Sequence, residues 1–537
     1  MSEVLKDYGR KRNDPASKQL ENYAMNAAPS KVLDWMGLGQ GQTIMTMSNG
    51  CPVANRKDVK TAGRRGPLVV EDIVFFDEWQ HFNREKIPER VVHAKGNGAH
   101  GFFVVTNDIT KYSRAAIFSE IGKETPLFIR FSQVIPEKGG SDTVRDPRGF
   151  AIKFYTEEGN WDLVANNTPI FFTRDPQMFI SFIHSQKRNP ATNLKDSNMQ
   201  WDFLSLRPES THQVMYMFGD RGIPASFRTM NGYGSNTFKL VNKDNQAVYC
   251  KFHIKCKEVR NLLPEDAQLL AGMEPDFYGR DLYNAIEDGI YPEWMMYIQV
   301  MTFEEAENWK FDPFDVTKVW PHGEFPLIPV GKIVLNRNPK NYFAEVEQAA
   351  FAPSNIVPGI DFSPDKMLQG RIFAYKDTQL HRLGKNFMKL PINCPYRTKV
   401  VNYQVDGESV HEHNDGMPTY YPNSFMGPVE ASDLKEHVWP VIGDCKRYED
   451  VTEEKDEDNF TQPGIFWNKV LDQAARTRLV KNIVVSLKDC KEFIQDRAIE
   501  NFTKVDPEFG RMVRAGVDAE YNVIKDVAPE LSQKMKI

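Results

Sequence analysis

The sequence has little that would direct it to a membrane, to nucleic acid or to a disulfide-bonded fold. Its 537 residues contain no apolar run near the ~18 residues that a membrane-spanning helix needs. The 6 cysteines are scattered without a Cys-x-x-Cys pair, which excludes the usual zinc and iron–sulfur spacings and predicts free thiols in a reducing compartment. A net charge of −6 argues against nucleic acid or an anionic membrane surface as a partner.

The chain is instead rich in residues that fill a globular interior. Hydrophobic residues make up 41% and aromatic residues 12% of it, which is enough for a large core. The length allows several domains or one large core with appendages, and no internal repeat is evident. The first residues are charged and have no apolar stretch, so we expect no secretory signal.

Strand patterns dominate residues 93–303. Ala247–Cys256 alternates apolar and polar residues, and a turn at 243–245 joins it to a second strand at 237–241. Another turn at 158–160 separates two further strands. Several long alternating strands with hairpin turns predict an α+β protein built on a closed antiparallel β-barrel.

Helical patterns flank this region. We expect a helix over 72–82, and an amphipathic helix that Pro463 opens and that continues to Leu487 within a helical domain. The chain is then predicted to have four parts, namely an N-terminal arm (1–70), a β-barrel domain (71–335), a long aperiodic segment that holds one helix (336–455) and a C-terminal helical domain (456–537).

The helix within the long segment carries a distinctive pair. Arg371 stands four residues before Tyr375, which places both on one helical face, and Arg382 returns to that face if the helix continues. A permanent positive charge at this distance favours the phenolate over the phenol. Ser363 as N-cap and Pro364 at the first helical position predict where the helix begins. Alone, such an Arg/Tyr pair is commonplace on helix surfaces.

Three motifs that occur in the order of one known family indicate a role for this Arg/Tyr pair. The run RIFAYKDT at 371–378 resembles the proximal haem signature of the haem catalases, Arg-x-Phe-x-Tyr-x-Asp-Thr. The runs ERVVHAKG at 89–96 and NWDLVANNTP at 160–169 resemble the distal segments of the same family. The similarity extends from about residue 65 to about residue 425, and the sequence is identified as a member of the small-subunit, animal-like type.

The resemblance implies an eight-stranded, catalase-like barrel, a reaction and an active site. A haem catalase disproportionates hydrogen peroxide to water and oxygen, here with haem b held by Tyr375 as the axial ligand of the iron. His93 would be the distal histidine, which moves a proton between the peroxide oxygens because imidazole titrates near neutrality. Asn166 would hold the peroxide with its amide, and Arg371 would keep Tyr375 ionised.

The resemblance also implies further site residues. Those expected against the haem are Arg90, Val92, Arg130, Ser132, Phe179, Arg371 and Arg382, and those of the access channel are Val134 and Asp146. A site for NADPH would comprise His212, Arg221, Tyr233, Lys255, Val319, Trp320 and His322. The chain departs from the family pattern at Tyr216 and Gly219, where Phe and Ser are usual, and at Asn236, where many relatives have histidine.

Alternatives remain open at this point. A haem hydroperoxide isomerase or peroxygenase on the same fold is disfavoured by Val92, since the allene oxide synthases have threonine there. A non-catalytic haem- or NADPH-binding protein is disfavoured by His93 and Asn166. Gly96, Gly98 and Gly101 fit a dinucleotide fingerprint, but a strand-like run follows them, so we expect these glycines to admit a flat ligand instead.

Assembly and location follow from the resemblance as well. Catalases have a segment that wraps around neighbouring subunits, which implies a homotetramer and accounts for the aperiodic residues 336–455. The family is typically peroxisomal, with the cytoplasm as the alternative. The chain ends Met535-Lys536-Ile537, which does not match the Ser-Lys-Leu peroxisomal signal.

Overall fold

The computed structural model describes residues 14–23, 44–410, 416–439, 443–448 and 458–527. It divides into two compact units, one of Arg10–Glu89 and one that contains Arg90–Ile537 with the first nine residues. The smaller unit holds α2 (Pro15–Lys18), η1 (Gln19–Tyr23) and α4 (Ile73–Phe82), so the helix expected at 72–82 is confirmed. No helix within these described ranges is long and apolar enough to cross a bilayer.

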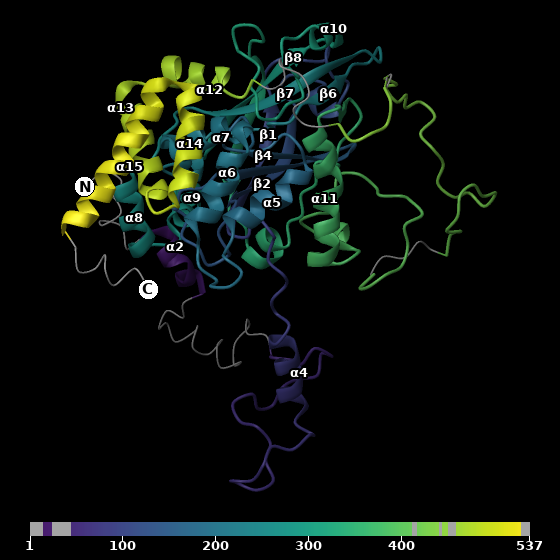
Figure 1. The fold of residues 1–537 in the computed structure, drawn as a ribbon. Helices are drawn as coiled ribbons and strands as arrows, with labels where there is room; N and C mark the ends of the chain where they lie inside the picture. The colour runs from purple at the N-terminus through teal and green to yellow at the C-terminus, as the bar shows by residue number, and fades with distance from the viewer. Residues whose placement is uncertain (1–13, 24–43, 411–415, 440–442, 449–457, 528–537) are drawn as a thin grey trace. The chain divides into compact units, whose positions relative to one another are not determined.

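A single antiparallel sheet is the centre of the larger unit (Figure 1). The sheet closes into a barrel because β7 pairs with β8. The barrel has eight strand positions, one of which β5 and β6 share, since both pair with β7. The predicted barrel is therefore confirmed. The strands described are β1 (Gly96–Val105), β2 (Glu124–Gln133), β3 (Arg148–Thr156), β4 (Gly159–Asn166), β5 (Gly232–Tyr233), β6 (Phe238–Val241), β7 (Ala247–Cys256), β8 (Glu293–Met301), β9 (Ile328–Arg337) and β10 (Ile360–Phe362).

Aromatic side chains fill the barrel. Phe131 packs edge-on against Phe150 with ring centroids 4.9 Å apart, and Phe150 packs likewise against Trp294 at 5.4 Å. Phe154 stacks on Trp161 at 4.6 Å. All five side chains are buried, and burial of such large apolar surfaces makes this core the main stabilising element of the fold.

Helices interrupt the strand region more than its pattern predicted. The connections contain α5 (Gln177–Gln186), α6 (Ser197–Leu206), α7 (Thr211–Phe218), α8 (Pro264–Met273), α9 (Phe277–Glu287) and α10 (Phe303–Glu307), with 3-10 turns η2 (Ala116–Phe118), η3 (Pro208–Ser210), η4 (Asp220–Gly222) and η5 (Phe227–Thr229). Every residue of α7 is buried, so this helix has no polar face and no helical period to detect.

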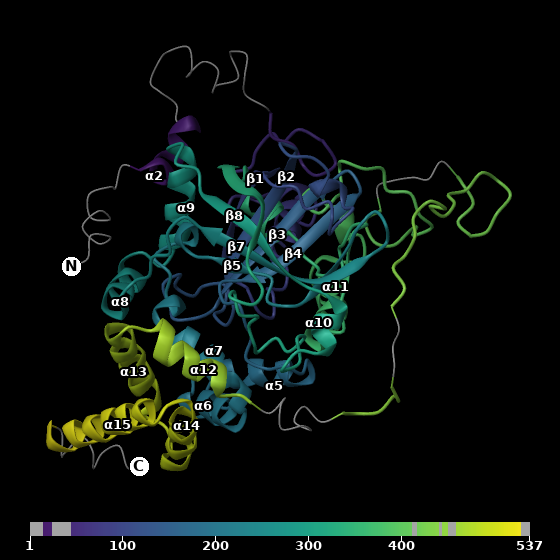
Figure 2. The same cartoon turned by 90° about the horizontal axis from the view of Figure 1, so that it is seen from above.

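The C-terminal helices lie beside α6 and α7 (Figure 2). They are α12 (Thr461–Ile465), the π-helical turn η8 (Phe466–Val470), α13 (Gln473–Leu487), α14 (Glu492–Val505) and α15 (Pro507–Val527). The prediction of one continuous helix from 463 to 487 was wrong. The backbone is extended at Leu471, and Asp472 caps a new helix by accepting a hydrogen bond from the Ala475 amide at 2.7 Å.

The helix that carries Arg371 and Tyr375 is α11 (Lys366–Leu383), preceded by the π-helical turn η6 (Phe343–Glu347) and followed by η7 (Phe387–Lys389). It begins later than predicted. Asp365, not Ser363, is the N-cap, because its carboxylate accepts from the Leu368 amide at 3.0 Å. The hydroxyl of Ser363 instead donates to the carbonyl of Thr237 at 2.5 Å.

Candidate functional site

A row of directly paired residues crosses three strands of the barrel. Ser132 of β2 pairs with Gly149 of β3, and Gly149 pairs with Asn166 of β4. Side chains at paired positions point to the same face of a sheet. The strand register therefore brings Asn166 and Ser132 to one face, separated only by a glycine.

His93 lies against this row. It lies three residues before β1, with a positive φ of 65°, and its amide donates to the carbonyl of Val134 at 3.0 Å. Its Nδ1 lies 2.9 Å from the hydroxyl oxygen of Ser132, which leaves Nε2 for a substrate. A Cβ at Gly149 would come within 2.7 Å of this Nδ1, so the ring occupies the space that only glycine leaves. Ser132, which we expected to lie against the haem, thus orients the ring of His93.

The surroundings keep His93 neutral. Burial, and then the positive charges of Arg130 and Arg371, lower the pKa of His93 from its ordinary 6.5 to about 3. A neutral imidazole can accept a proton at physiological pH, which is the state that a general base requires. The influence of Arg371 also shows that the site predicted from residues 89–96 and the site predicted from residues 371–378 converge.

Tyr375 is paired with Arg371 as the spacing predicted. One guanidinium nitrogen, Nη2, donates to the Tyr375 oxygen at 3.2 Å and to the carbonyl of Val164 at 2.7 Å. The guanidinium carbon lies 5.1 Å from the centre of the Tyr375 ring. Val164 stands two residues before Asn166 on β4, so the same strand supports the tyrosine pair and the distal amide. This arrangement directs a cationic donor at the Tyr375 oxygen.

Three arginines form a cationic cradle beside the site. Arg90 and Arg382 both donate to the carbonyl of Ala349, at 2.8 and 2.9 Å, and Arg130 donates to the carbonyl of His93 at 2.8 Å. Burial, followed by the neighbouring cation Arg130, lowers the pKa of Arg382 to about 10. Nη1 of Arg90 and Nε of Arg130 are buried without a hydrogen-bond partner in the described structure. These unused donors fit a ligand that carries carboxylates, such as the propionates of haem.

The remaining residues predicted against the haem or the channel lie nearby. Val92 and Phe179 pack against one apolar cluster, where Phe179 stacks on Phe171 at 5.9 Å. The Asp146 carboxylate accepts from the amides of Val134, at 2.5 Å, and Ile135, at 3.0 Å. Burial raises the pKa of Asp146 to about 6. Since Val134 also accepts from the His93 amide, Asp146 supports the backbone that holds His93.

The residues predicted to bind NADPH fall into adjoining groups. The Tyr233 hydroxyl lies 3.0 Å from Nζ of Lys255 and 3.3 Å from Nη1 of Arg221. Burial acts to raise the pKa of Tyr233, but Arg221 and Lys255 lower it overall. These two cations contact a phenol and no carboxylate within the described residues, which suits a phosphate.

A second group extends from this cluster. Burial lowers the pKa of His212 to about 4, and its Nδ1 has no partner among the described residues. Tyr216 lies between the His212 ring, at 5.4 Å, and Phe466, on which it stacks at 4.6 Å. Val319 exchanges two hydrogen bonds with the side chain of Gln462. The other predicted residues here are His322, 5.8 Å from the His253 ring, and the buried Trp320.

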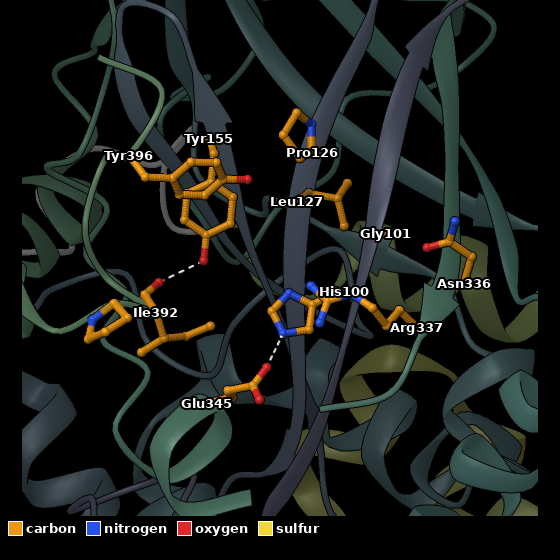
Figure 3. Close-up of a pocket in the computed structure, with 11 residues that line it drawn as sticks. His100, Gly101, Pro126, Leu127, Tyr155, Asn336, Arg337, Glu345, Ile392 and Tyr396 are labelled. Atoms are coloured by element: carbon orange, nitrogen blue, oxygen red, sulfur yellow. Dashed lines mark hydrogen bonds and ion pairs between the residues drawn. The ribbon is translucent and has the colours of Figure 1, made fainter. Parts of the chain in front are cut away.

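A separate cavity of about 550 Å³ holds none of these residues (Figure 3). His100 and Glu345 face each other there at 2.5 Å, and the Tyr155 hydroxyl donates to the carbonyl of Ile392 at 2.6 Å. His100 and Glu345 are therefore each other's partners, and the Tyr155 hydroxyl is engaged by the backbone.

Several contributing residues were not found from the sequence. Gly149 makes room for His93, Glu347 lies among the three arginines, and Gln462 and Phe466 border the second cofactor site. A Cβ at Gly96 would meet the Arg130 guanidinium at 2.8 Å. The glycines of β1 make room for neighbouring protein atoms, and the strand that excludes a Rossmann fold is confirmed.

A closed antiparallel barrel that joins a neutral histidine, an amide and an arginine-bonded tyrosine is the combination expected of a catalase, the haem enzyme in which a tyrosine holds the iron. The family model described as Catalase matches residues 46–427, and one described as Catalase-related immune-responsive matches residues 452–517. The chain therefore belongs to the catalase family, whose members are oxidoreductases acting on hydrogen peroxide and whose cofactor is haem.

Relatives and solved structures agree with this assignment. A catalase of Ascaris suum is 63% identical over 94% of this chain and 90% of its own length, and one of Rattus norvegicus is 57% identical over 95% and 94%. The crystal structure of a fungal catalase superposes with a TM-score of 0.86 at 44% identity, covering 88% of this chain and 96% of that chain. Catalase A from Saccharomyces cerevisiae gives 0.85 at 43% identity, covering 88% and 99%.

Proposed function

We propose that this protein is a haem b catalase of the small-subunit type that converts two molecules of hydrogen peroxide to two of water and one of oxygen. The observation that carries the proposal is the convergence of a neutral His93, with Nε2 free, and the Arg371–Tyr375 pair on one site. When bound there, haem would supply the two electrons that reduce one hydrogen peroxide to water and would regain two electrons from the second peroxide, which leaves as oxygen.

His93 moves the proton in this mechanism. Its Nε2 takes a proton from one peroxide oxygen and delivers it to the other, which then leaves as water. Ser132 fixes the ring through Nδ1, and the amide of Asn166 donates a hydrogen bond that orients the peroxide. Because His93 is neutral over a wide pH range, it is ready to accept the proton without first losing one.

The remaining residues of the site would hold the haem. Tyr375 would ligate the iron, with Arg371 stabilising its phenolate, and the cradle of Arg90, Arg130 and Arg382 would bind the propionates. Phe179 and Val92 would pack beside the ring on the distal side, with Val134 and Asp146 lining the approach of peroxide.

Oxygen evolution tests the proposal directly. The purified protein should release oxygen from hydrogen peroxide at an electrode, and Tyr375→Phe should abolish haem retention and this release together. The rival haem hydroperoxide isomerase would consume an organic hydroperoxide and release no oxygen. A haem- or NADPH-binding protein without activity would do neither, so the three alternatives give different results.

NADPH is the proposed second ligand. Arg221 and Lys255 would contact its phosphates, and His212, Tyr233, Val319, Trp320 and His322 would surround it. The supporting observation is the cationic pair that lacks a carboxylate in the described residues, next to the unpaired Nδ1 of His212. Tyr216, at a position where phenylalanine is usual, fills part of this region through its stack on Phe466.

A homotetramer is the proposed assembly, with hydrogen peroxide as substrate and no nucleic acid or membrane as partner. No residue of α4 is buried, and Ile73, Trp79 and Phe82 are 59%, 50% and 61% exposed. An apolar helix of this kind needs another surface to cover it. Residues 1–70 would be the arm, 71–335 the barrel domain, 336–455 the wrapping segment and 456–537 the helical domain. Trp79→Asp with Phe82→Asp should lower the mass measured by sedimentation.

The proposed location is the peroxisome, with the cytoplasm as the alternative. The proposal rests on the relationship to animal catalases, such as those of Rattus norvegicus and Mus musculus. The final residues that bear on import lie outside the described residues. Imaging of the native protein with and without residues 535–537 distinguishes the two compartments.

A further inference from the structure

Glu347 is a buried carboxylate that none of the roles above employs. It is the last residue of the turn η6, and its side chain is only 2% exposed. Its backbone carbonyl accepts from Nη2 of Arg90 at 3.0 Å and from Nη1 of Arg382 at 2.5 Å, so this point of the chain is part of the arginine cradle. A buried carboxylate beside cations is expected to accept hydrogen bonds from them.

The carboxylate of Glu347 does not satisfy the arginine donors. Its Oε2 has no hydrogen-bond partner among the described residues, and the same is true of Nη1 of Arg90 and Nε of Arg130. The groups are nonetheless close enough to influence one another. Burial lowers the pKa of Arg90, Arg130 and Arg382, and the charge of Glu347 acts to raise the pKa of each. Donors and an acceptor therefore stay apart within one buried cluster.

Lys138 contacts the same carboxylate from the solvent side. Its Nζ lies 3.2 Å from Oε2 of Glu347, while its side chain is 48% exposed. The loop that carries this lysine is fixed two residues further on, where the carbonyl of Gly140 accepts from Nζ of Lys95 at 2.6 Å. The loop therefore holds a cation at the oxygen of Glu347 that the arginines leave unused.

We propose that Lys138 is a positioning residue that draws the carboxylate of Glu347 away from the arginine cradle and so keeps the unpaired arginine donors available for the carboxylates of haem. This role rests on the proposed function, in which the cradle holds the haem propionates. Without the lysine, the Glu347 carboxylate would be free to turn to the arginines, and a charge-assisted bond between them would occupy the donors. The same carboxylate would then repel a propionate.

The test is a double-mutant cycle on the haem-loaded protein, in which the rate of haem transfer to excess apomyoglobin is measured at neutral pH. Lys138→Met should speed transfer about tenfold, because Glu347 would compete for an arginine donor and haem would lose one charge-assisted hydrogen bond. Combining Lys138→Met with Glu347→Gln should bring the rate back toward that of the wild type, since no second carboxylate then competes. Lys138→Arg should keep the wild-type rate, because a guanidinium also pairs with a carboxylate.

Lys332→Met is the matched control, since Lys332 is 39% exposed and pairs with Glu293 at 3.1 Å across strands β8 and β9. Wild-type transfer in Lys138→Met, or equal acceleration in Lys332→Met, would overturn the positioning role. A double variant that loses haem as fast as Lys138→Met would also overturn it, because Lys138 would then act on haem directly and not through Glu347. A wild-type protein that holds no haem would instead overturn the proposed function, and this role with it.

Discussion

Gly149 and His93 are in such close contact that a Cβ on Gly149 would lie 2.7 Å from Nδ1 of the imidazole. The same Cβ would lie 2.3 Å from the Ser132 hydroxyl oxygen that orients this ring. Neither neighbour can retreat easily, because His93 is tied to Val134 through its backbone and Ser132 is inside β2. The glycine is thus a condition for the orientation of the histidine.

Gly149→Ala should therefore reduce kcat strongly while haem remains bound. The added methyl group would displace the imidazole from its bond with Ser132, and misplacement of a general base by about 1 Å can cost ~10²-fold. Oxygen release and haem stoichiometry measure the two effects. Gly272→Ala is the control, since a Cβ at Gly272 in α8 meets nothing within 4 Å. Wild-type kcat in Gly149→Ala would contradict the proposed fit.

His93→Ala should leave haem bound and remove nearly all oxygen release. The proton shuttle is lost while the proposed iron ligand lies on the opposite side, and a general acid–base group typically contributes ~10²–10⁴-fold. His100→Ala is a suitable control because His100 pairs with Glu345 in the separate cavity. Oxygen evolution at the wild-type rate in His93→Ala would rule out His93 as the proton carrier.

Alternation of apolar and polar residues predicted β7 and its hairpin with β6, although the central residues of β7 are buried on both faces of the sheet. Periodic patterns missed α7, which is buried on all sides and shows no amphipathic period. Motifs located His93, Asn166 and Tyr375. The contact of Asn236 with Asp365 joins residues 129 positions apart, and the role of Gly149 depends on the strand register, so neither has a local signal.

The activity should vary little with pH between about 5 and 8. Burial and the nearby arginines lower the pKa of His93 to about 3, so the ring remains neutral over this range and no acid limb near 6.5 is expected. The measurement is kcat/KM for oxygen release against pH. An acid limb with a midpoint near 6.5 that His93→Gln removes would contradict a neutral His93.

The stability of the protein at acid pH should also reflect the lowered pKa of His93. Below about pH 6.5 the His93 ring binds a proton in the unfolded protein, whereas in the folded protein it stays neutral down to about pH 3. The free energy of unfolding therefore falls as the pH decreases across this window. His212, with a pKa lowered to about 4, acts in the same sense, whereas the raised pKa of Asp146 acts in the opposite sense. In denaturant titrations, His93→Gln should therefore lose less stability between pH 7 and 5 than the wild type.

Arg371→Leu should weaken haem retention and change the visible spectrum. The Tyr375 oxygen would lose the cationic donor that contacts it, and the proposed bond from this oxygen to iron would lose that support. Arg476→Leu is a matched control, because Arg476 lies over the Trp467 ring at 5.2 Å and donates to a carbonyl in the C-terminal domain. An unchanged spectrum and full haem content in Arg371→Leu would show that another group stabilises the phenolate.

The last prediction concerns NADPH and the two departures near its proposed site. Arg221→Ala should weaken NADPH binding by more than about tenfold, since a charge-assisted bond to phosphate is lost. Restoring the usual serine with Gly219→Ser should not strengthen binding here, because a Cβ at Gly219 would meet the Met215 carbonyl oxygen at 2.7 Å. The backbone would have to move before the hydroxyl could reach a ligand. Calorimetric titration of cofactor-stripped protein with NADPH and NADH measures both effects. Equal binding of the two nucleotides, or none at millimolar concentration, would show that Arg221, Lys255 and Tyr233 serve the fold alone.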